Sequence, residues 1–153
     1  MVTYISKEQY EKLKQELGYL KSQVRKQIAE RLKNAVEMGD ISENAEYDIA
    51  MAERESLERK IAELENILKI AKIISDSKSS NKILPGKKFD VIEKLTNKKY
   101  TFTLVGFGES NPSEGKISTD SPLGKAFLNK RAGDEVVVQV PKGKIVYVIK
   151  KIY

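Results

Sequence analysis

The first half of the chain carries an apolar pattern that reverses about a point between Asp40 and Ile41. On either side of that point, apolar residues recur at alternating spacings of three and four, which marks one face of a helix. Two such faces, reflected about a short break, can pack as an antiparallel coiled-coil hairpin with its tip at the centre. The pattern therefore predicts a helical hairpin. The mirrored pairs are Tyr10 with Ala71, Leu13 with Leu68, Leu17 with Leu64, Leu20 with Ile61 and Val24 with Leu57.

Local signals suggest where the two helices begin and end. Residues 6–9, Ser-Lys-Glu-Gln, fit a capping box, so we expect the first helix to run from Ser6 to about Met38. The second helix should run from about Ser42 to Ile74. After Val24 the apolar spacing changes to steps of four, which is typical of a local departure from the heptad repeat. About 30 residues at ~1.5 Å each give an arm roughly 45 Å long.

The second half of the chain changes to short β-rich segments. We expect one helix within it, with Ser121 as N-cap and Pro122 at the first helical position. Tight turns are expected at residues 132–134 and 141–143. The expected strands cover Lys88–Leu95, Tyr100–Val105, Glu135–Val140 and Ile145–Ile149.

These patterns predict an α+β chain of two small domains. Residues 1–75 form the helical hairpin with an acidic tip, and residues 83–153 form a small antiparallel β domain with a short helix. Residues 76–82 between them are polar and small, which is typical of a linker.

Composition narrows the chemistry that the chain can perform. It contains no cysteine and no histidine, which excludes disulfide frameworks, thiolate zinc sites, cysteine nucleophiles and histidine-based triads. Any chemistry must therefore use carboxylates. No apolar run of transmembrane length and no signal-like opening is present, so we expect a cytoplasmic protein with no membrane partner.

The net charge of +6 is shared unevenly along the chain. Residues 1–75 carry 13 basic and 14 acidic side chains, whereas residues 76–153 carry 15 and 8. Within the first half, one basic stretch precedes the acidic tip. Such a stretch suits contact with phosphates, although an ordinary solvated helix face explains it equally well. Its members are Lys12, Lys14, Lys21, Arg25, Lys26, Arg31 and Lys33.

The tip concentrates negative charge, with six carboxylates and no lysine or arginine between Glu37 and Glu53. Asp40 and Glu43 are three residues apart, so on the first turn of a helix they would lie on one side. Two carboxylates at this spacing suit Mg²⁺, which keeps much of its water and takes further ligands from a partner. The same spacing also fits a capping box, in which Asp40 accepts a hydrogen bond from the amide of Glu43.

Other tip residues have more than one interpretation. Glu46 and Asp48 add charge that a cap does not require, and we leave them outside the site. Asn44 either fixes the turn by bonding to the backbone or touches a partner. Tyr47 either packs near the tip or stacks on a base.

The tip sequence Gly39-Asp40-Ile41-Ser42-Glu43-Asn44-Ala45-Glu46-Tyr47 resembles the signature of the bacterial Gre transcript cleavage factors. In that signature, Gly-Asp-Leu and a variable residue precede Glu-Asn-Ala-Glu-Tyr. A second family-like segment runs from Asp120 to Leu128 and continues at residues 133–136. Ile41 stands where leucine is commoner, and Asn129 stands where relatives often have glycine. With the hairpin, the resemblance covers nearly the whole chain.

The resemblance implies a transcription elongation factor that is not itself an enzyme. Its hairpin would enter the secondary channel of bacterial RNA polymerase and bring Asp40 and Glu43 to the catalytic centre. There they would help to hold a Mg²⁺ ion jointly with the polymerase. That ion can activate water for in-line attack on a phosphodiester, so that backtracked nascent RNA is cut and a new 3′ end is left in register.

The resemblance has further implications for the rest of the chain. Residues 83–153 would have an FKBP-like fold and would dock at the channel entrance, and the basic stretch from Lys12 to Lys33 would meet the extruded RNA. We expect the free protein to be a monomer that binds Mg²⁺ only weakly.

Three other functions compete with this interpretation. A Gre-like factor without cleavage activity would occupy the same channel as an inhibitor, although the presence of both Asp40 and Glu43 argues against it. A prolyl isomerase would need an aromatic-lined apolar pocket in residues 83–153. A structural coiled-coil adaptor would tolerate Asp40→Asn as well as it tolerates neutral changes elsewhere on the hairpin.

Overall fold

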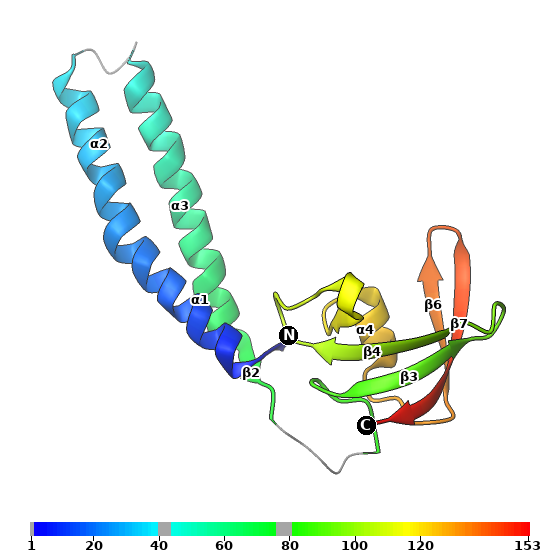
Figure 1. Ribbon diagram of the computed structural model, residues 1–153. Coiled ribbons are helices and arrows are strands. Elements are labelled where there is room, and N and C mark those ends of the chain that lie inside the picture. Colours follow the sequence, from blue (N-terminus) through cyan, green and yellow to red (C-terminus); the bar gives the residue numbers. More distant parts are fainter. Residues whose placement is uncertain (1, 40–43, 76–80) are drawn as a thin grey trace. The chain divides into compact units, whose positions relative to one another are not determined.

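The computed structural model describes residues 2–39, 44–75 and 81–153 (Figure 1). By its internal contacts the chain forms two compact units, which we treat separately. The first, here the sheet unit, contains residues 1–9 and 71–153. The second, here the hairpin unit, contains residues 10–70. The predicted division placed all of residues 1–75 with the hairpin. By internal contacts, residues 1–9 and the residues from 71 onward belong to the sheet unit instead.

The predicted helical hairpin is present. Its first arm contains α1 (Lys7–Tyr19), a π-helical turn η1 (Leu20–Val24) and α2 (Arg25–Glu37). Its second arm is α3 (Ala45–Ile70), and α2 and α3 lie side by side in Figure 1. The Ser6 hydroxyl accepts a hydrogen bond from the Gln9 N–H at 3.1 Å, which confirms Ser6 as the N-cap of α1.

Several of the mirrored apolar residues, together with Ile28 and Leu32, form the contact between the two arms. Ile28 on α2 packs with Leu57 and Ile61 on α3, and these three side chains are at most 6% exposed. Burying an aliphatic side chain of this size contributes about 1.5–3 kcal/mol. Isolated helices are marginal in water, so this contact holds both arms together. The half-buried residues around it are Leu17, Leu20, Val24 and Leu32.

The π turn lies at the point where the apolar spacing changes. The Arg25 N–H donates to the Leu20 carbonyl, five residues back, and the Ser22 hydroxyl donates to the Gly18 carbonyl at 2.7 Å. A π turn takes up an extra residue within an α-helix. The extra residue therefore lets the successive steps of four from Leu20 through Val24 and Ile28 to Leu32 stay against α3.

The second arm ends earlier than predicted. Residues Ala71–Ile73 are not helical but form strand β2, which pairs in parallel with β1 (Thr3–Ile5). The Ile74 N–H donates to the Ile5 carbonyl at 2.9 Å, and Ile5 is fully buried. Helical periodicity could not reveal this change, because the three residues of β2 are too few to show a period of their own.

The β1 strand is also hydrogen-bonded to residues 83–153, here the sheet domain. The Phe107 N–H donates to the Tyr4 carbonyl at 2.8 Å, and the Ser6 hydroxyl donates to a carboxylate oxygen of Glu109 at 2.6 Å. Ser6 thus caps α1 and bonds to a residue 103 positions away. These bonds explain why residues 1–9 belong to the sheet unit.

The sheet domain contains a five-stranded sheet in the order β5-β4-β3-β7-β6. Neighbouring strands are antiparallel except β4 and β5, which are parallel. The prediction of a purely antiparallel sheet was therefore wrong at this edge, where the three-residue strand β5 was missed. The strands are β3 (Lys88–Glu93), β4 (Lys99–Val105), β5 (Lys116–Ser118), β6 (Glu135–Val140) and β7 (Gly143–Ile152), and a 3₁₀ turn, η3 (Pro112–Glu114), precedes β5.

One face of the sheet is covered by α4 (Pro122–Phe127). The Ser121 hydroxyl accepts a hydrogen bond from the Gly124 N–H at 3.0 Å, with Pro122 at the start of the helix, as predicted. After α4 the chain turns at Asn129 with a backbone φ of 66°. Asparagine tolerates this left-handed conformation better than most residues, so it can occupy a position where relatives often have glycine.

Gly106 should be essential to the junction between β1 and the sheet domain. A Cβ atom there would lie 2.9 Å from both the Cα of Ile5 and the carbonyl oxygen of Tyr4, and neither backbone atom can move alone. We expect Gly106→Ala to destabilise the protein by about 1–3 kcal/mol, measured by urea unfolding. Gly18→Ala is the control, since nothing lies within 4 Å of its Cβ and it should stabilise α1 by about 0.5–1 kcal/mol. Equal effects of both changes would contradict the close approach.

Candidate functional site

The predicted site residues Asp40 and Glu43 lie outside the described residues, as do Ile41 and Ser42. Their expected role as Mg²⁺ ligands therefore stays a prediction. Across residues 2–39, 44–75 and 81–153, no group of three or more acidic side chains is arranged to hold a metal ion. What the structure does describe is the pair of helix ends on either side of the tip.

The first helix end is closed by backbone bonds and a glycine. The Met38 N–H donates to the carbonyls of Asn34 and Ala35, each at 3.2 Å. Gly39 follows with a φ of +130°, a conformation that L side chains rarely adopt and glycine adopts readily. The chain therefore leaves α2 at the glycine of the Gly-Asp pair.

The second helix end is capped by Asn44. Its side-chain oxygen accepts from the Glu46 N–H at 3.1 Å and the Tyr47 N–H at 3.4 Å. Its amide nitrogen donates to the Ala35 carbonyl at 2.6 Å. Asn44 therefore satisfies groups at both helix ends and ties α2 to α3, which confirms its turn-fixing role.

This arrangement corrects the prediction for the start of the second helix. The helix begins at Ala45 rather than near Ser42, and its cap is Asn44 rather than Asp40. The capping box of Asp40 and Glu43 itself lies outside the described residues. The sequence holds the signal for Asn44 as the cap of α3, because asparagine is among the residues most favoured at N-caps.

Glu46 and Asp48 also find an ordinary structural explanation. Both lie in the first turn of α3, where the helix dipole stabilises negative charge. Their position gives these two acids a role in stabilising the helix end.

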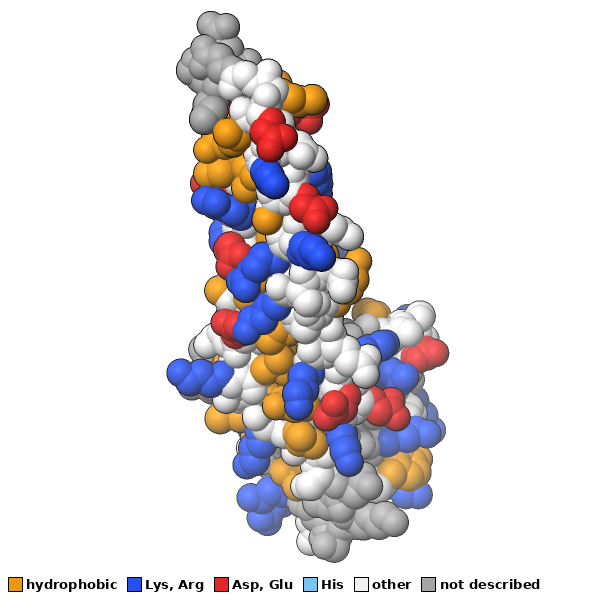
Figure 2. All heavy atoms as spheres, turned by 90° about the vertical axis from the view of Figure 1, so that its left-hand side faces the viewer, with side chains coloured by type: hydrophobic (Ala, Val, Ile, Leu, Met, Phe, Trp, Pro, Cys, Tyr) orange, Lys and Arg blue, Asp and Glu red, His pale blue; other side chains and the backbone are white. Residues whose placement is uncertain are grey.

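The hairpin exposes apolar side chains next to the tip. Met38 is 74% exposed and Ile49 is 55% exposed, and Figure 2 shows hydrophobic side chains gathered near this end of the hairpin. Both residues line a shallow hollow of about 130 Å³ together with Arg31 and Glu46. Large apolar side chains that stay exposed beside a polar tip suit contact with another protein.

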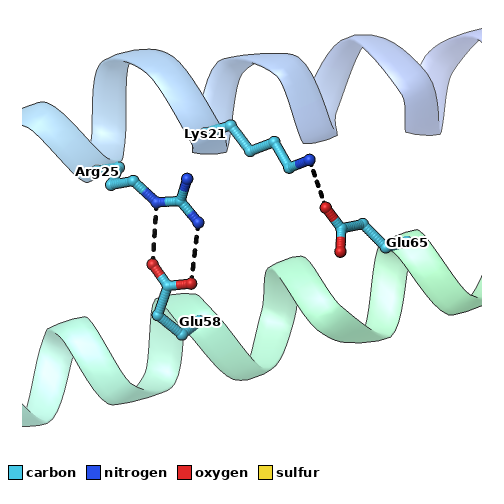
Figure 3. Close-up of polar contacts among 4 residues, drawn as sticks. All are labelled: Lys21, Arg25, Glu58 and Glu65. Carbon is cyan, nitrogen blue, oxygen red and sulfur yellow. Dashed lines mark hydrogen bonds and ion pairs between the residues drawn. The ribbon is translucent and has the colours of Figure 1, made fainter.

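Below the tip, ion pairs join the two arms of the hairpin. The Arg25 guanidinium donates two hydrogen bonds to Glu58, at 3.0 and 2.9 Å, and Lys21 pairs with Glu65 (Figure 3). The bonds from Arg25 hold the pKa of Glu58 below its ordinary value, and those to Glu58 raise the pKa of Arg25. A third ion pair joins Arg31 to Glu53, with a guanidinium nitrogen of Arg31 2.5 Å from a carboxylate oxygen of Glu53.

These pairs change the interpretation of the basic stretch. Three of its seven members, Lys21, Arg25 and Arg31, are neutralised by glutamates of α3. Part of the stretch therefore joins the arms, and Figure 2 shows basic and acidic side chains interspersed along the hairpin. The other four members are exposed and have no ion-pair partner among the residues that the structure describes; they are Lys12, Lys14, Lys26 and Lys33.

Five of the seven aromatic residues in residues 83–153 belong to the core or pack against it; they are Phe89, Tyr100, Phe102, Phe127 and Tyr147. Phe89 and Phe127 are fully buried with their ring centroids 5.0 Å apart, and Tyr147 packs on Phe127 at 5.6 Å. These rings fill the space between the sheet and α4. They do not line an open pocket of the kind that a prolyl isomerase requires.

The membrane expectation can be tested only on the helices. Among the helices of the described residues, none is both long enough and apolar enough to cross a membrane.

Comparison with protein families gives two matches that together span nearly the whole chain. The family described as "Transcription elongation factor, N-terminal" matches residues 3–73. The family described as "Transcription elongation factor, GreA/GreB, C-term" matches residues 78–153. The recognised motifs at residues 39–47 and 120–136 fall one in each match.

Individual relatives agree with the family matches. The transcription elongation factor GreA of Bacillus subtilis is 44% identical over 142 residues, which cover 93% of this chain and 90% of that protein. GreA of Geobacillus kaustophilus is 46% identical, with 92% of this chain and 90% of the relative covered. Among solved structures, the GreA factor homolog Gfh1 of Thermus thermophilus is 27% identical, with 100% of this chain and 99% of Gfh1 covered and a TM-score of 0.46.

Substitution of Asn44 should separate its two roles. We expect Asn44→Ala to lose both the cap and the bond to Ala35, with a loss of about 1 kcal/mol or more of stability. Asn44→Asp should lose less, since it keeps the oxygen that accepts from Glu46 and Tyr47. Amide hydrogen exchange would check this, because exchange at those two amides should accelerate in Asn44→Ala and not in Asn44→Asp. Equal acceleration in both variants would contradict the cap.

The Arg25–Glu58 pair should make the hairpin's stability depend on pH. Because the pKa of Glu58 is lowered in the folded state, its contribution is present above its unfolded pKa and is lost as pH falls through the folded value. Glu58→Gln should therefore lower the melting temperature at pH 7, and the difference from the unaltered protein should disappear well below about pH 4. Glu55→Gln on the same helix is the control and should leave the melting temperature unchanged at both pH values. A difference for Glu58→Gln that persisted at low pH would contradict the ion pair.

Proposed function

The chain belongs to the GreA/GreB family of transcription elongation factors, and from that membership we propose how it acts on RNA polymerase. The hairpin enters the secondary channel of the enzyme. Its tip then brings Asp40 and Glu43 to the catalytic centre, where polymerase cuts backtracked RNA. The protein works where the polymerase works, in the cytoplasm of a bacterium.

The chemistry requires both partners. In a two-metal site, one ion activates the attacking water and the pair stabilises the charge that develops on the phosphodiester. Two carboxylates hold Mg²⁺ weakly by themselves, because this ion takes its remaining ligands from water, substrate phosphates or a second macromolecule. Asp40 and Glu43 lend those two carboxylates to the polymerase, and the bond is broken in the polymerase's own site.

The observation that best supports this role is the cap of α3. Asn44 satisfies the first amides of α3 and the Ala35 carbonyl of α2. Neither Asp40 nor Glu43 is needed for these bonds. Because Asn44 supplies the cap of α3, the two carboxylates remain available for metal binding at a shared site.

The rest of the hairpin fits delivery of the tip over a distance. The 26 residues of α3 make a rod about 39 Å long, and its contact with α2 is stabilised by buried aliphatic residues. The exposed Met38 and Ile49 would contact the channel wall beside the catalytic centre. The hairpin thus carries its acids further than the loops of a compact domain could reach.

Cleavage of backtracked RNA tests the proposal directly. We expect Asp40→Asn and Glu43→Gln each to reduce stimulated cleavage at least about 100-fold, as removal of one charge-stabilising group does at other catalytic centres. The assay uses backtracked elongation complexes with labelled RNA and Mg²⁺, with binding to polymerase measured on the same samples. Asp48→Asn is the matched control, because it removes an acid from the same helix end and should keep cleavage close to that of the unaltered protein.

The outcomes separate the competing functions. Loss of cleavage with retained binding supports the shared metal site. If the unaltered protein binds without stimulating cleavage, the chain is a channel-occupying inhibitor. If Asp40→Asn and Glu43→Gln cleave normally, the two carboxylates have no catalytic part and the adaptor function takes its place.

A further inference from the structure

The sheet unit carries all of the chain's positive excess. Residues 1–9 and 71–153 contain 17 basic and 9 acidic side chains, a net charge of +8, whereas residues 10–70 contain 11 and 13, a net charge of −2. A net charge of this size on one compact unit attracts polyanions. The question is which surface of the unit presents it.

The face of the sheet opposite α4, here the outer face, presents lysines from four strands. Successive side chains of a strand point to opposite faces of a sheet, and residues paired across neighbouring strands share a face. The strand register therefore identifies the residues of the outer face. Asp90 pairs with Thr101 and Lys151, Ile92 with Lys99, and Thr103 with Lys88 and Lys116, whereas α4 packs against their alternates. The exposed lysines of the outer face are Lys88, Lys99, Lys116, Lys144 and Lys151.

The acids near this face are already bonded. Glu135 pairs with Lys94 at 2.9 Å, and Glu114 pairs with Lys116 at 3.0 Å. Asp90 accepts from the Tyr153 hydroxyl and from the Thr101 hydroxyl, each at 2.7 Å. The bond from Tyr153, followed by that from Thr101, holds the pKa of Asp90 below its ordinary value, so this carboxylate stays ionised and keeps Tyr153 in place.

Tyr153 in turn positions two of the lysines. The Nζ atoms of Lys88 and Lys151 lie 5.4 and 4.6 Å from the centroid of its ring. Cation–π attraction of this kind orders a lysine that would otherwise sample many rotamers. The two ammonium groups are consequently at most about 10 Å apart. Lys99 and Lys144 have no carboxylate partner among the described residues.

We propose that the outer face of the sheet binds the phosphate backbone of single-stranded RNA. The lysines are spread in two dimensions over a sheet whose strands are about 4.8 Å apart, and a flexible single strand can follow such a surface as a rigid duplex cannot. Half-exposed apolar residues between them, Val146 and Ile92 among others, offer contacts to bases that need no sequence preference. The choice of RNA over DNA rests on membership of the elongation factors, and the binding does not depend on Asp40 or Glu43.

Binding of free, full-length protein to RNA tests this surface without polymerase. The probe is a fluorescein-labelled oligouridine of about 20 nucleotides, longer than one binding site of this class, followed by fluorescence anisotropy over a salt series. Lys99→Gln combined with Lys151→Gln should weaken binding about 10- to 30-fold at 0.1 M salt and reduce the salt slope by about 1.4, as expected for two lost phosphate contacts.

The matched control removes the same charge from the other unit. Lys60→Gln combined with Lys69→Gln changes two exposed lysines of α3, outside the basic stretch, and should bind like the unaltered protein, with circular dichroism confirming that both double variants are folded. An equal or larger loss in the control would place the RNA site on the hairpin instead. No measurable binding by the unaltered protein, or tighter binding of duplex DNA than of oligouridine, would overturn the proposal. The cleavage assay is read separately, so failure of either proposal leaves the other standing.

Discussion

The hairpin depends on the burial of aliphatic side chains along the contact between its two arms. Neither arm has a second layer to pack against within residues 10–70, and the helices of such a chain are stable only as a pair. The apolar contact must therefore stay in register from one end to the other. Backbone and side-chain bonds hold that register at both ends: β1 with β2 at one, and Asn44 with Ala35 at the other. Between them the cross-arm ion pairs, which are exposed, favour one alignment without adding much stability.

Much of this fold could be predicted because the relevant signals are local. The cap at Ser6, the proline that starts α4 and four of the five strands of the larger sheet each depend on residues close together in the sequence. The features that were missed depend on partners far away. Strands β1, β2 and β5 are three residues each, and they are strands only because a distant segment supplies their hydrogen bonds. The sequence indicated the π turn only as a change in apolar spacing after Val24. The spacing shows that the apolar face departs from the heptad repeat, but it does not show which backbone hydrogen bond accommodates the extra residue.

The candidate site was predictable to a different degree. The motif identified Asp40 and Glu43, which lie outside the described residues, and the spacing there did not indicate Asn44 as the cap of α3. That cap depends on bonds to both helices, because the Asn44 side chain donates to Ala35 while it accepts from Glu46 and Tyr47. The basic stretch was ambiguous for a similar reason, because a sequence gives the charge of Arg25 without showing that Glu58 neutralises it.

The cap at Asn44 has a consequence for how such a protein can evolve. The described bonds that close α2 and begin α3 come from Met38 and Asn44, and these bonds use no side chain of positions 40–43. Substitutions at those positions can therefore change the chemistry of the tip and leave this link between the two helices in place.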